Sequence, residues 1–444
     1  MFRKIVSDTQ KNPSRRCRLQ LEVLEDRCLL SGADLTVMSY NLYQGSELTQ
    51  AIAISSLGQL PAAVSAVEAE VAATDIRGRA AAWANLVAET GPDLLALQEA
   101  SLWRIQTPSS TLTGHQTPAT TVLYDFIGSL VNDLAAKGLH YTVVGTVNGL
   151  NVQGPDATGN DLRLTDRVAL LARADEPPGQ LRWANVQSAD YHTNIVLSIG
   201  GPGGLAVTVF NGWVSADFTK RGETFRVITT HLDALVPAIG DAQAHELING
   251  PANTTMPVIV MGDLNSPADG SGSPAHQDFI AAGFQDSWTQ ANPGDPGFTV
   301  QRQVNLQAPV FQATQRIDYV MTHGGFGVDS MSLEGTDPAD RTASGLWPSD
   351  HAAIVAKLDM PRHLDWISGN QHSVSLGLAV IGDTMSKAGT PAGASANGSW
   401  FLDPRQTGTS QPNPHDNQAG NKVMDVTSVW DWDELGYFIR SLLK

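Results

Sequence analysis

The stretch VIVMGDLN (residues 258–265) is the most informative part of this 444-residue chain. Its first four residues are apolar and mostly β-branched, which predicts a strand buried on both faces. Asp263 and Asn265 follow at once, and residues two apart in an extended chain point to the same side. The stretch therefore predicts a buried strand that ends in a carboxylate and an amide on one side.

Nine further segments are rich in Val, Ile, Thr and aromatic residues and are bounded by Gly, Pro, Asn or Asp, a pattern that predicts strands. They cover residues 35–42, 93–99, 141–147, 168–173, 194–199, 205–218, 224–232, 317–323 and 352–358. Helices are predicted over residues 61–90, 122–137, 241–248 and 274–282. Many strands with a few helices between them predict an α+β protein with two packed sheets flanked by helices.

The composition limits the kinds of partner that the chain can bind. Hydrophobic residues make up 42% and charged residues 16% of the sequence, which is enough apolar material for a folded core. The formal net charge is −17, and residues 34–360 by themselves carry −18. Such an acidic body repels phosphate backbones unless cations intervene, so a basic nucleic-acid scaffold is excluded. No apolar run of about 18 residues is present, so no membrane-spanning helix is predicted.

The two ends of the chain differ from its centre, which predicts three parts: 1–33, 34–360 and 361–444. Residues 1–33 carry a net charge of +3, hold both cysteines and include LEVLEDRCLLS. This string resembles a leader on surface and exported proteins of some bacteria, which implies export or a cell-surface location, with the cytoplasm and a disordered basic tail as alternatives. Residues 361–444 are rich in Gly, Ser, Asn and Pro and are interpreted as an appendage of unknown role.

Polar side chains lie at or next to the ends of several of the predicted strands: Asn41, Glu99, His231, Asp263, Asn265, Asp318, and Asp350 and His351 just before the last strand. An oxygen-rich set of this kind favours a hard cation such as Mg²⁺, Mn²⁺ or Ca²⁺. Two histidines beside it would exchange protons near neutral pH. Each residue alone also has an ordinary structural interpretation, for example a loop-stabilising Asn41 or a buried, satisfied His231. The order of the whole set along the chain favours a site.

Six motifs in this order resemble the endonuclease/exonuclease/phosphatase superfamily, which includes DNase I-like nucleases, inositol-polyphosphate phosphatases and bacterial sphingomyelinases. They are MSYNL, LLALQEAS, VITTHLD, VIVMGDLNS, QRIDYVM and WPSDHAAI, and they span residues 35 to about 360. The resemblance implies a DNase I-like, four-layered α/β sandwich in which two mainly antiparallel sheets are flanked by helices. It also implies a metal site in which Glu99 is the main ligand and Asn41 and Asp350 lie close to the same ion.

The resemblance further implies the catalytic roles. Asp263 and Asn265 would orient the attacking water and the phosphate. His351 would face the phosphate, with its ring held by Asp318, and His231 would donate a proton to the leaving oxygen. The histidine at the position of His231 is kept in the DNase I-like and sphingomyelinase branches. The resemblance therefore places this chain nearer to those branches.

The expected activity is divalent-metal-dependent hydrolysis of phosphodiester or phosphomonoester bonds, with Mg²⁺, Mn²⁺ or Ca²⁺ as cofactor. The alternative is a surface or binding module that keeps the fold without catalysis. Arg167 is interpreted either as a phosphate clamp or as a surface partner of Asp166. The segments 104–121 and 148–165 are expected to be long loops that frame the substrate entrance, and neither carries a Lys and Arg cluster. The substrate therefore stays open between nucleic acid, a phospholipid headgroup and a small metabolite, and no protein partner is predicted.

Overall fold

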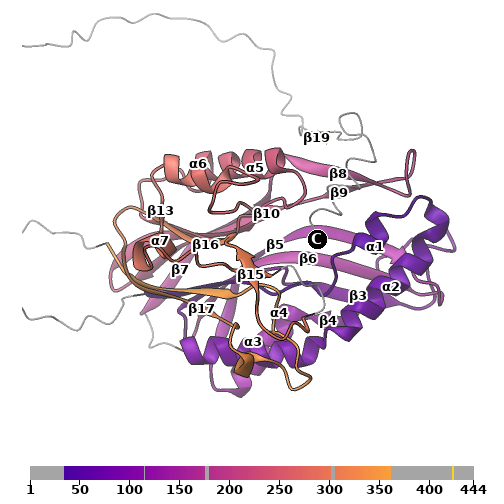
Figure 1. The fold of residues 1–444 in the computed structure, drawn as a ribbon, viewed down its shortest axis with the longest axis horizontal. Helices are drawn as coiled ribbons and strands as arrows, with labels where there is room; N and C mark the ends of the chain where they lie inside the picture. Colours follow the sequence, from indigo (N-terminus) through magenta and orange to yellow (C-terminus); the bar gives the residue numbers. More distant parts are fainter. Residues whose placement is uncertain (1–34, 115, 176–179, 302–305, 362–422, 425–444) are drawn as a thin grey trace, which may run out of the picture.

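The computed structural model describes residues 35–114, 116–175, 180–301, 306–361 and 423–424 (Figure 1). The predicted leader and all of the appendage except residues 361 and 423–424 lie outside this part of the chain. Among the described helices, none is both long enough and apolar enough to cross a membrane.

The first sheet has eight strands in the order β17-β18-β1-β2-β6-β3-β4, with β5 also paired to β6. The strands are β1 (Leu35–Asn41), β2 (Leu94–Gln98), β3 (Leu102–Gln106), β4 (Thr121–Asp125), β5 (Tyr141–Pro155), β6 (Asp161–Arg173), β17 (Gly327–Glu334) and β18 (Ala353–Asp359). All of its pairs are antiparallel except β1 with β2.

The second sheet has six strands in the order β13-β16-β12-β11-β10-β7. The strands are β7 (Leu181–Asp190), β10 (Gly212–Lys220), β11 (Glu223–His231), β12 (Val258–Asp263), β13 (Gln285–Asp286) and β16 (Asp318–His323). Here too one pair is parallel, β11 with β12, and the others are antiparallel. The prediction of two mainly antiparallel sheets is therefore confirmed.

Helices cover the outer face of each sheet, so the layers run helix, sheet, sheet, helix (Figure 1). The helices are α1 (Thr49–Ile52), α2 (Leu60–Ala73), α3 (Ile76–Thr90), α4 (Phe126–Ala136), α5 (Pro237–Asn249), α6 (Ala275–Ala281) and α7 (Ser287–Ala291), with 3₁₀ turns η1 (Leu57–Gln59) and η2 (Pro338–Asp340). Helices α2 to α4 pack on the first sheet, and α5 and α6 pack on the second. The predicted four-layered sandwich is thus confirmed.

The strand β12 shows how alternation along the sequence builds these layers. Ile259 and Met261 enter the core between the two sheets, whereas Val258 and Val260 pack under the helices of the second sheet. The strand is buried on both faces, as the run of apolar residues predicts. At Gly262 a Cβ would overlap the carbonyl oxygen of Thr230 on β11, so the approach of these two strands requires glycine just before Asp263.

Two small sheets complete the fold. The hairpin of β8 (Asn194–Ile199) and β9 (Leu205–Val209) extends beyond the second sheet, and β19 (Val423–Met424) pairs with β8 in parallel (Figure 1). The pair β14 (Val300–Gln301) and β15 (Ala313–Gln315) lies in the long connection before β16.

Three of the predicted elements differ from the observed ones. The predicted helix over residues 61–90 is two helices, because Asp75 adopts a left-handed φ of 48° and caps α3 through its carboxylate. The predicted strand over 205–218 is broken at residues 210–211 into β9 and β10. Residues 122–125 form the end of β4 rather than the start of a helix. The strands without a predicted counterpart are β3, β4, β7, β13, β14, β15, β17 and β19.

The prediction of a long loop over residues 148–165 is wrong, because most of this segment belongs to the β5–β6 hairpin. Its Gly, Asn and Thr residues have low or modest intrinsic strand preference. Cross-strand pairing, for example of Asn151 with Thr165, supplies the backbone hydrogen bonds that the composition alone does not reveal. Residues 104–106 and 121 of the other predicted loop, 104–121, also belong to strands.

Candidate active site

The candidate site lies where the two parallel strand pairs end. Asn41 closes β1 and Glu99 directly follows β2, its parallel neighbour in the first sheet. In the second sheet His231 and Asp263 stand opposite each other at the ends of β11 and β12. Asp318 pairs with Asp263 at the start of antiparallel β16. Because the carboxyl ends of parallel strands meet at one edge, both sheets bring their polar residues to the same rim.

The amide of Asn41 connects the two sheets. Its Nδ2 donates to Glu99 Oε1 at 3.0 Å and to Asp263 Oδ2 at 3.1 Å. The second oxygen of Glu99 accepts from the backbone N–H of Gln44 at 2.6 Å. Glu99 itself adopts a left-handed φ of 49°, which is uncommon outside glycine. The fold therefore holds this carboxylate in one position at the cost of local strain.

Asn265 has the same kind of backbone, with a φ of 45°. Its N–H donates to Asp263 Oδ1 at 2.9 Å, and its Nδ2 donates to the carbonyl of Leu232 at 2.9 Å. The side-chain N–H that bonds Leu232 fixes the orientation of the amide. Asp263 and Asn265, the predicted carboxylate–amide pair, are thus a rigid unit, held by the carbonyl of Leu232 directly after β11.

Two imidazoles flank Asp263. His351 Nε2 lies 3.9 Å and His231 Nε2 lies 3.7 Å from Asp263 Oδ2. On its other side His351 places Nδ1 2.8 Å from Asp318 Oδ2. A carboxylate only accepts hydrogen bonds, so the proton of neutral His351 lies on Nδ1 and Nε2 faces the site.

The buried carboxylates shift the pKa values of both imidazoles upward. Burial by itself lowers the pKa of His351, but Asp318, Asp350 and Asp263 outweigh it and hold the pKa well above its usual value. Burial also opposes protonation of His231, whose pKa is nevertheless raised by Asp263 and Glu99. In both imidazoles the neighbouring carboxylates therefore favour the protonated form.

Asp350 and Ser349 lie in the loop before β18. Ser349 Oγ donates to the carbonyl of Asn41 at 2.7 Å and accepts from the N–H of His351 at 3.1 Å, so it joins this loop to the end of β1. Burial and the nearby Glu99 raise the pKa of Asp350 to about 6. Two carboxylates in one buried site repel each other, and this repulsion is what a bound cation would offset.

The donor set fits a divalent cation. Glu99 and Asp350 supply two carboxylates, the oxygen ligands that Mg²⁺, Mn²⁺ and Ca²⁺ prefer, and Asn41 holds Glu99 through Nδ2 while its Oδ1 accepts from the N–H of Tyr43 at 2.9 Å. Among the described residues, Asp318 Oδ1 and His231 Nδ1 are buried without a hydrogen-bond partner. Asp263, Asp318 and His351 also bring one ligand atom each to within 4.8 Å of one another.

The structure adds residues that the sequence interpretation missed. Asp166 on β6 reaches the site because β6 pairs with β2. Burial and the nearby Glu99 raise its pKa to about 6. Glu47, an exposed residue in the loop before α1, also lines the cavity. Only the pairing of β6 with β2 identifies Asp166.

Arg79 on α3 is the fully buried cation behind the site. Its guanidinium donates to the carbonyls of Leu42, Tyr43 and Pro348 and to Thr74 Oγ1. It therefore ties the loop after Asn41 to the loop that carries Asp350. Its sequence context, an alanine-rich helix, gave no indication of this role.

Arg167 does not join the other predicted site residues. Its Nη2 forms an ion pair with Asp125 Oδ1 at 2.6 Å, and its Nε donates to the carbonyl of Ala100 at 2.7 Å. These contacts occupy the guanidinium on the β3–β4 side of β6, and Arg167 is not among the residues that line the cavity. Its partner is Asp125 rather than Asp166, which faces the site.

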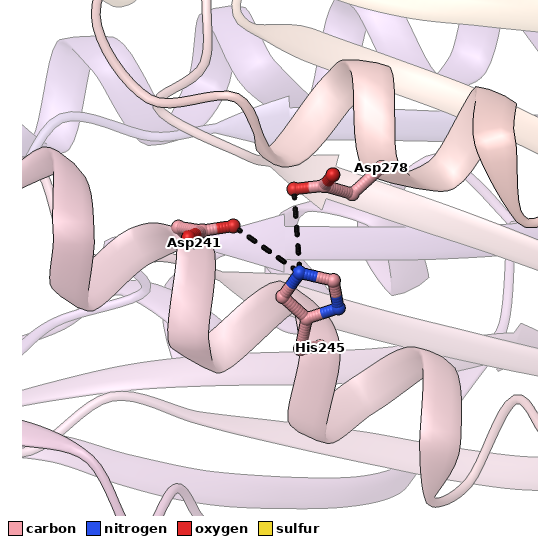
Figure 2. A group of neighbouring side chains, drawn as sticks. All are labelled: Asp241, His245 and Asp278. Carbon is pink, nitrogen blue, oxygen red and sulfur yellow. Dashed lines mark ion pairs between the residues drawn. The ribbon is translucent and has the colours of Figure 1, made fainter.

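A second group of possible metal ligands lies on the helices of the second sheet (Figure 2). His245 Nε2 on α5 is 3.5 Å from Asp241 Oδ1, one turn earlier, and 3.8 Å from Asp278 Oδ2 on α6. The histidine is 55% exposed, and the three residues are not among those that line the cavity. This cluster links two surface helices.

The fold and the rim of carboxylates, amides and imidazoles define a class of two-sheet α/β sandwich proteins. The profile of the endonuclease/exonuclease/phosphatase family matches residues 38–351, and the chain belongs to this family. A comparison with curated protein sequences finds no match.

The solved structures that this chain resembles have low sequence identity to it. One is an endonuclease/exonuclease/phosphatase family protein from Leptotrichia buccalis C-1013-b, with 15% identity and a TM-score of 0.45, covering 73% of this chain and 100% of its own. Another is a mannosyl-6-phosphatase from Bacteroides thetaiotaomicron VPI-5482, with 17% identity, a TM-score of 0.44 and the same coverage. A third is a humanized D. rerio TDP2, with 15% identity and a TM-score of 0.43, covering 73% of this chain and 99% of its own.

Proposed function

We propose that this protein is a divalent-metal-dependent hydrolase of phosphate esters. The observation that carries the proposal is the convergence of Glu99, Asp263, Asp350, His231 and His351 on one buried rim, joined through Asn41. Family membership supports the same reaction type.

In the proposed reaction, water adds to phosphorus and the bond between phosphorus and the leaving oxygen breaks. Asp263 lies between the two imidazoles and, with Asn265 fixed beside it, orients the water and accepts its proton. His231 donates a proton to the departing oxygen. His351, held by Asp318, donates from Nε2 to a non-bridging oxygen of the phosphate. General acid–base groups of this kind each contribute about 10²–10⁴-fold.

The cation site would be formed by Glu99, Asn41 and Asp350. A bound Mg²⁺, Mn²⁺ or Ca²⁺ would neutralise charge on the non-bridging oxygens, which stabilises the transition state by several kcal/mol. The excess of acidic residues in the body makes this neutralisation necessary, since an anionic substrate meets buried carboxylates at the site.

The test is hydrolysis of a chromogenic phosphodiester and of the matching monoester by the full chain. We expect activity that EDTA abolishes and that excess Mg²⁺ or Mn²⁺ restores. Glu99→Gln should lower Mn²⁺ affinity in calorimetry at least tenfold, whereas Glu89→Gln, an exposed change on α3, should leave it unchanged. Hydrolysis that persists in EDTA, or in the variant His351→Ala, would contradict the proposal.

The second candidate is a binding module that keeps the fold without catalysis. It predicts no turnover of any phosphate ester and no metal binding that depends on Glu99. The complete set of site residues weighs against it, because the loss of one ligand or one imidazole would be enough to end catalysis.

A further inference from the structure

The cavity at the candidate site has a volume of about 480 Å³ and two chemically different ends. One end is the rim of carboxylates and imidazoles described above. The other end is lined by aliphatic side chains from α1, α2, β5, β6, β8 and β9, which we call the aliphatic channel. A volume of this size is typical of pockets that enclose a small ligand.

The strand β6 connects the two ends without interruption. Leu162, Leu164 and Asp166 are spaced two apart, so their side chains point to one face of the strand, and all three line the cavity. Asp166 belongs to the polar end, where Glu99 and His231 influence its charge. A ligand bound beside these residues therefore has direct access to Leu164 and then to Leu162.

The hairpin of β8 and β9 covers the channel. Leu205, Val207 and Val209 are again spaced two apart on β9, and all three line the cavity. At its turn a Cβ on Gly200 would lie 3.0 Å from the backbone N of Leu57, and one on Gly201 would lie 3.0 Å from the carbonyl oxygen of Ser55. The hairpin turn thus packs directly on the segment between α1 and η1, beside β5 (Figure 1).

The lining selects the chemistry of the occupant. Among the described residues that line the cavity none is Lys or Arg, and Trp103 and Phe210 are its two aromatic side chains. Single-stranded nucleic acid is bound through basic grooves and stacking aromatic residues, which this lining lacks. Aliphatic walls favour an aliphatic ligand, because burial of each methylene removes apolar surface from water.

We propose that the aliphatic channel holds the hydrocarbon chain of a lipid-like phosphate ester and places its phosphate at the rim formed by Glu99, Asp263 and His351. The inference rests on the proposed function, because the phosphate at the polar end is the reacting group. The channel would take one chain of a single dispersed molecule, in contrast to binding at a lipid surface.

The experiment compares p-nitrophenyl phosphodiesters that carry a methyl, butyl or octyl group, each at a concentration where the substrate is monomeric. We expect kcat/KM to rise about fourfold for each methylene until the channel is filled. If the kcat/KM values of the octyl and methyl substrates lie within twofold of each other, the proposal that the channel binds the hydrocarbon chain is contradicted. The proposed function would remain intact.

Binding measured without turnover separates the two proposals. Calorimetry with dodecyl phosphate and methyl phosphate should show tighter binding of dodecyl phosphate, with a negative heat-capacity change. Chain-dependent binding without hydrolysis of any ester would support the channel and overturn the catalytic proposal. Absence of chain-dependent binding overturns the channel. If the protein then elutes as a dimer in size-exclusion chromatography, and Val207→Trp converts it to a monomer, a second copy of the protein occupies the aliphatic channel.

A matched pair of variants tests where the hydrocarbon chain of the substrate binds. Val207→Trp places a large ring in the channel and should lower the octyl-to-methyl ratio of kcat/KM at least tenfold. Thr208→Trp, one residue along the same strand and pointing to the opposite face, should leave this ratio unchanged. Leu205→Asp is a second channel variant at a position that is 50% exposed, so the fold tolerates it, and it should lower the ratio in the same direction. Equal ratios in all three variants would overturn the proposal.

Discussion

Replacement of Arg79 by Met tests whether one buried guanidinium holds the two loops of the site in place. Arg79 Nε donates to the carbonyl of Pro348 at 2.8 Å, and Nη2 donates to the carbonyls of Leu42 and Tyr43. Methionine has a similar length and no donor. The variant therefore removes hydrogen bonds from the segment after Asn41 and from the loop that carries Asp350.

The expected cost follows from these contacts. The carbonyl of Pro348 still accepts from Trp83 Nε1 at 2.8 Å in the variant. The main loss is therefore the hydrogen bonds that Arg79 donates to the carbonyls of Leu42 and Tyr43. A buried carbonyl that loses its donor costs about 1–3 kcal/mol. Removal of the buried charge offsets part of this cost in stability, because burial disfavours the charged form and lowers the pKa of Arg79 to about 10. We therefore expect the free energy of unfolding to fall by about 3 kcal/mol.

Urea unfolding followed by circular dichroism measures this change. With a slope of about 3 kcal/mol/M, the midpoint should fall by about 1 M. The control is Arg77→Met, an exposed change two residues earlier on α3, which should stay within about 0.5 kcal/mol of the unchanged protein. Equal midpoints for Arg79→Met and Arg77→Met would refute the reasoning.

Two further predictions concern other carboxylates. Asp318→Asn should lower kcat about 10²–10⁴-fold in steady-state assays, because the neutral amide removes the charge that favours protonated His351 and its N–H can hold the ring in the other tautomer. The exposed change Asp329→Asn should have no effect, and equal kcat values for the two variants would contradict this role. Burial opposes ionisation of Asp286, yet His276 and Arg316 lower its pKa to about 2. Because this folded-state pKa lies below the unfolded value, Asp286 should contribute about 2 kcal/mol to stability at pH 7, lost as the pH falls from about 5 to 2. Asp286→Asn should remove this component of acid unfolding, and an unchanged acid transition would disprove it.

The sequence predicted those parts of the fold and the site that depend on local patterns. The apolar run before Asp263 predicted a strand buried on both faces, and β12 is one. Each predicted polar residue lies at an end of a strand or within three residues of one, and the strand ends meet at one rim of the two-sheet sandwich. The four-layered architecture was also predicted, since ten β-rich segments with a few helices between them allow few other ways to bury their faces.

Only the tertiary structure decided the features that depend on pairing between distant segments. Asp166 reaches Glu99 because β6 pairs with β2, whereas Arg167, the next residue, points away to Asp125. Arg79 is buried because α3 packs beneath two loops of the site.

The aliphatic channel is a tertiary feature of the same kind. It exists because β5, β6, the β8–β9 hairpin and two helices close around a common space. A sequence pattern shows which face of a strand is apolar, but not which of these faces meet. The sequence therefore determined which chemical groups lie at the strand ends. The shape of the cavity that binds the ligand was decided by how the surrounding strands and helices pack.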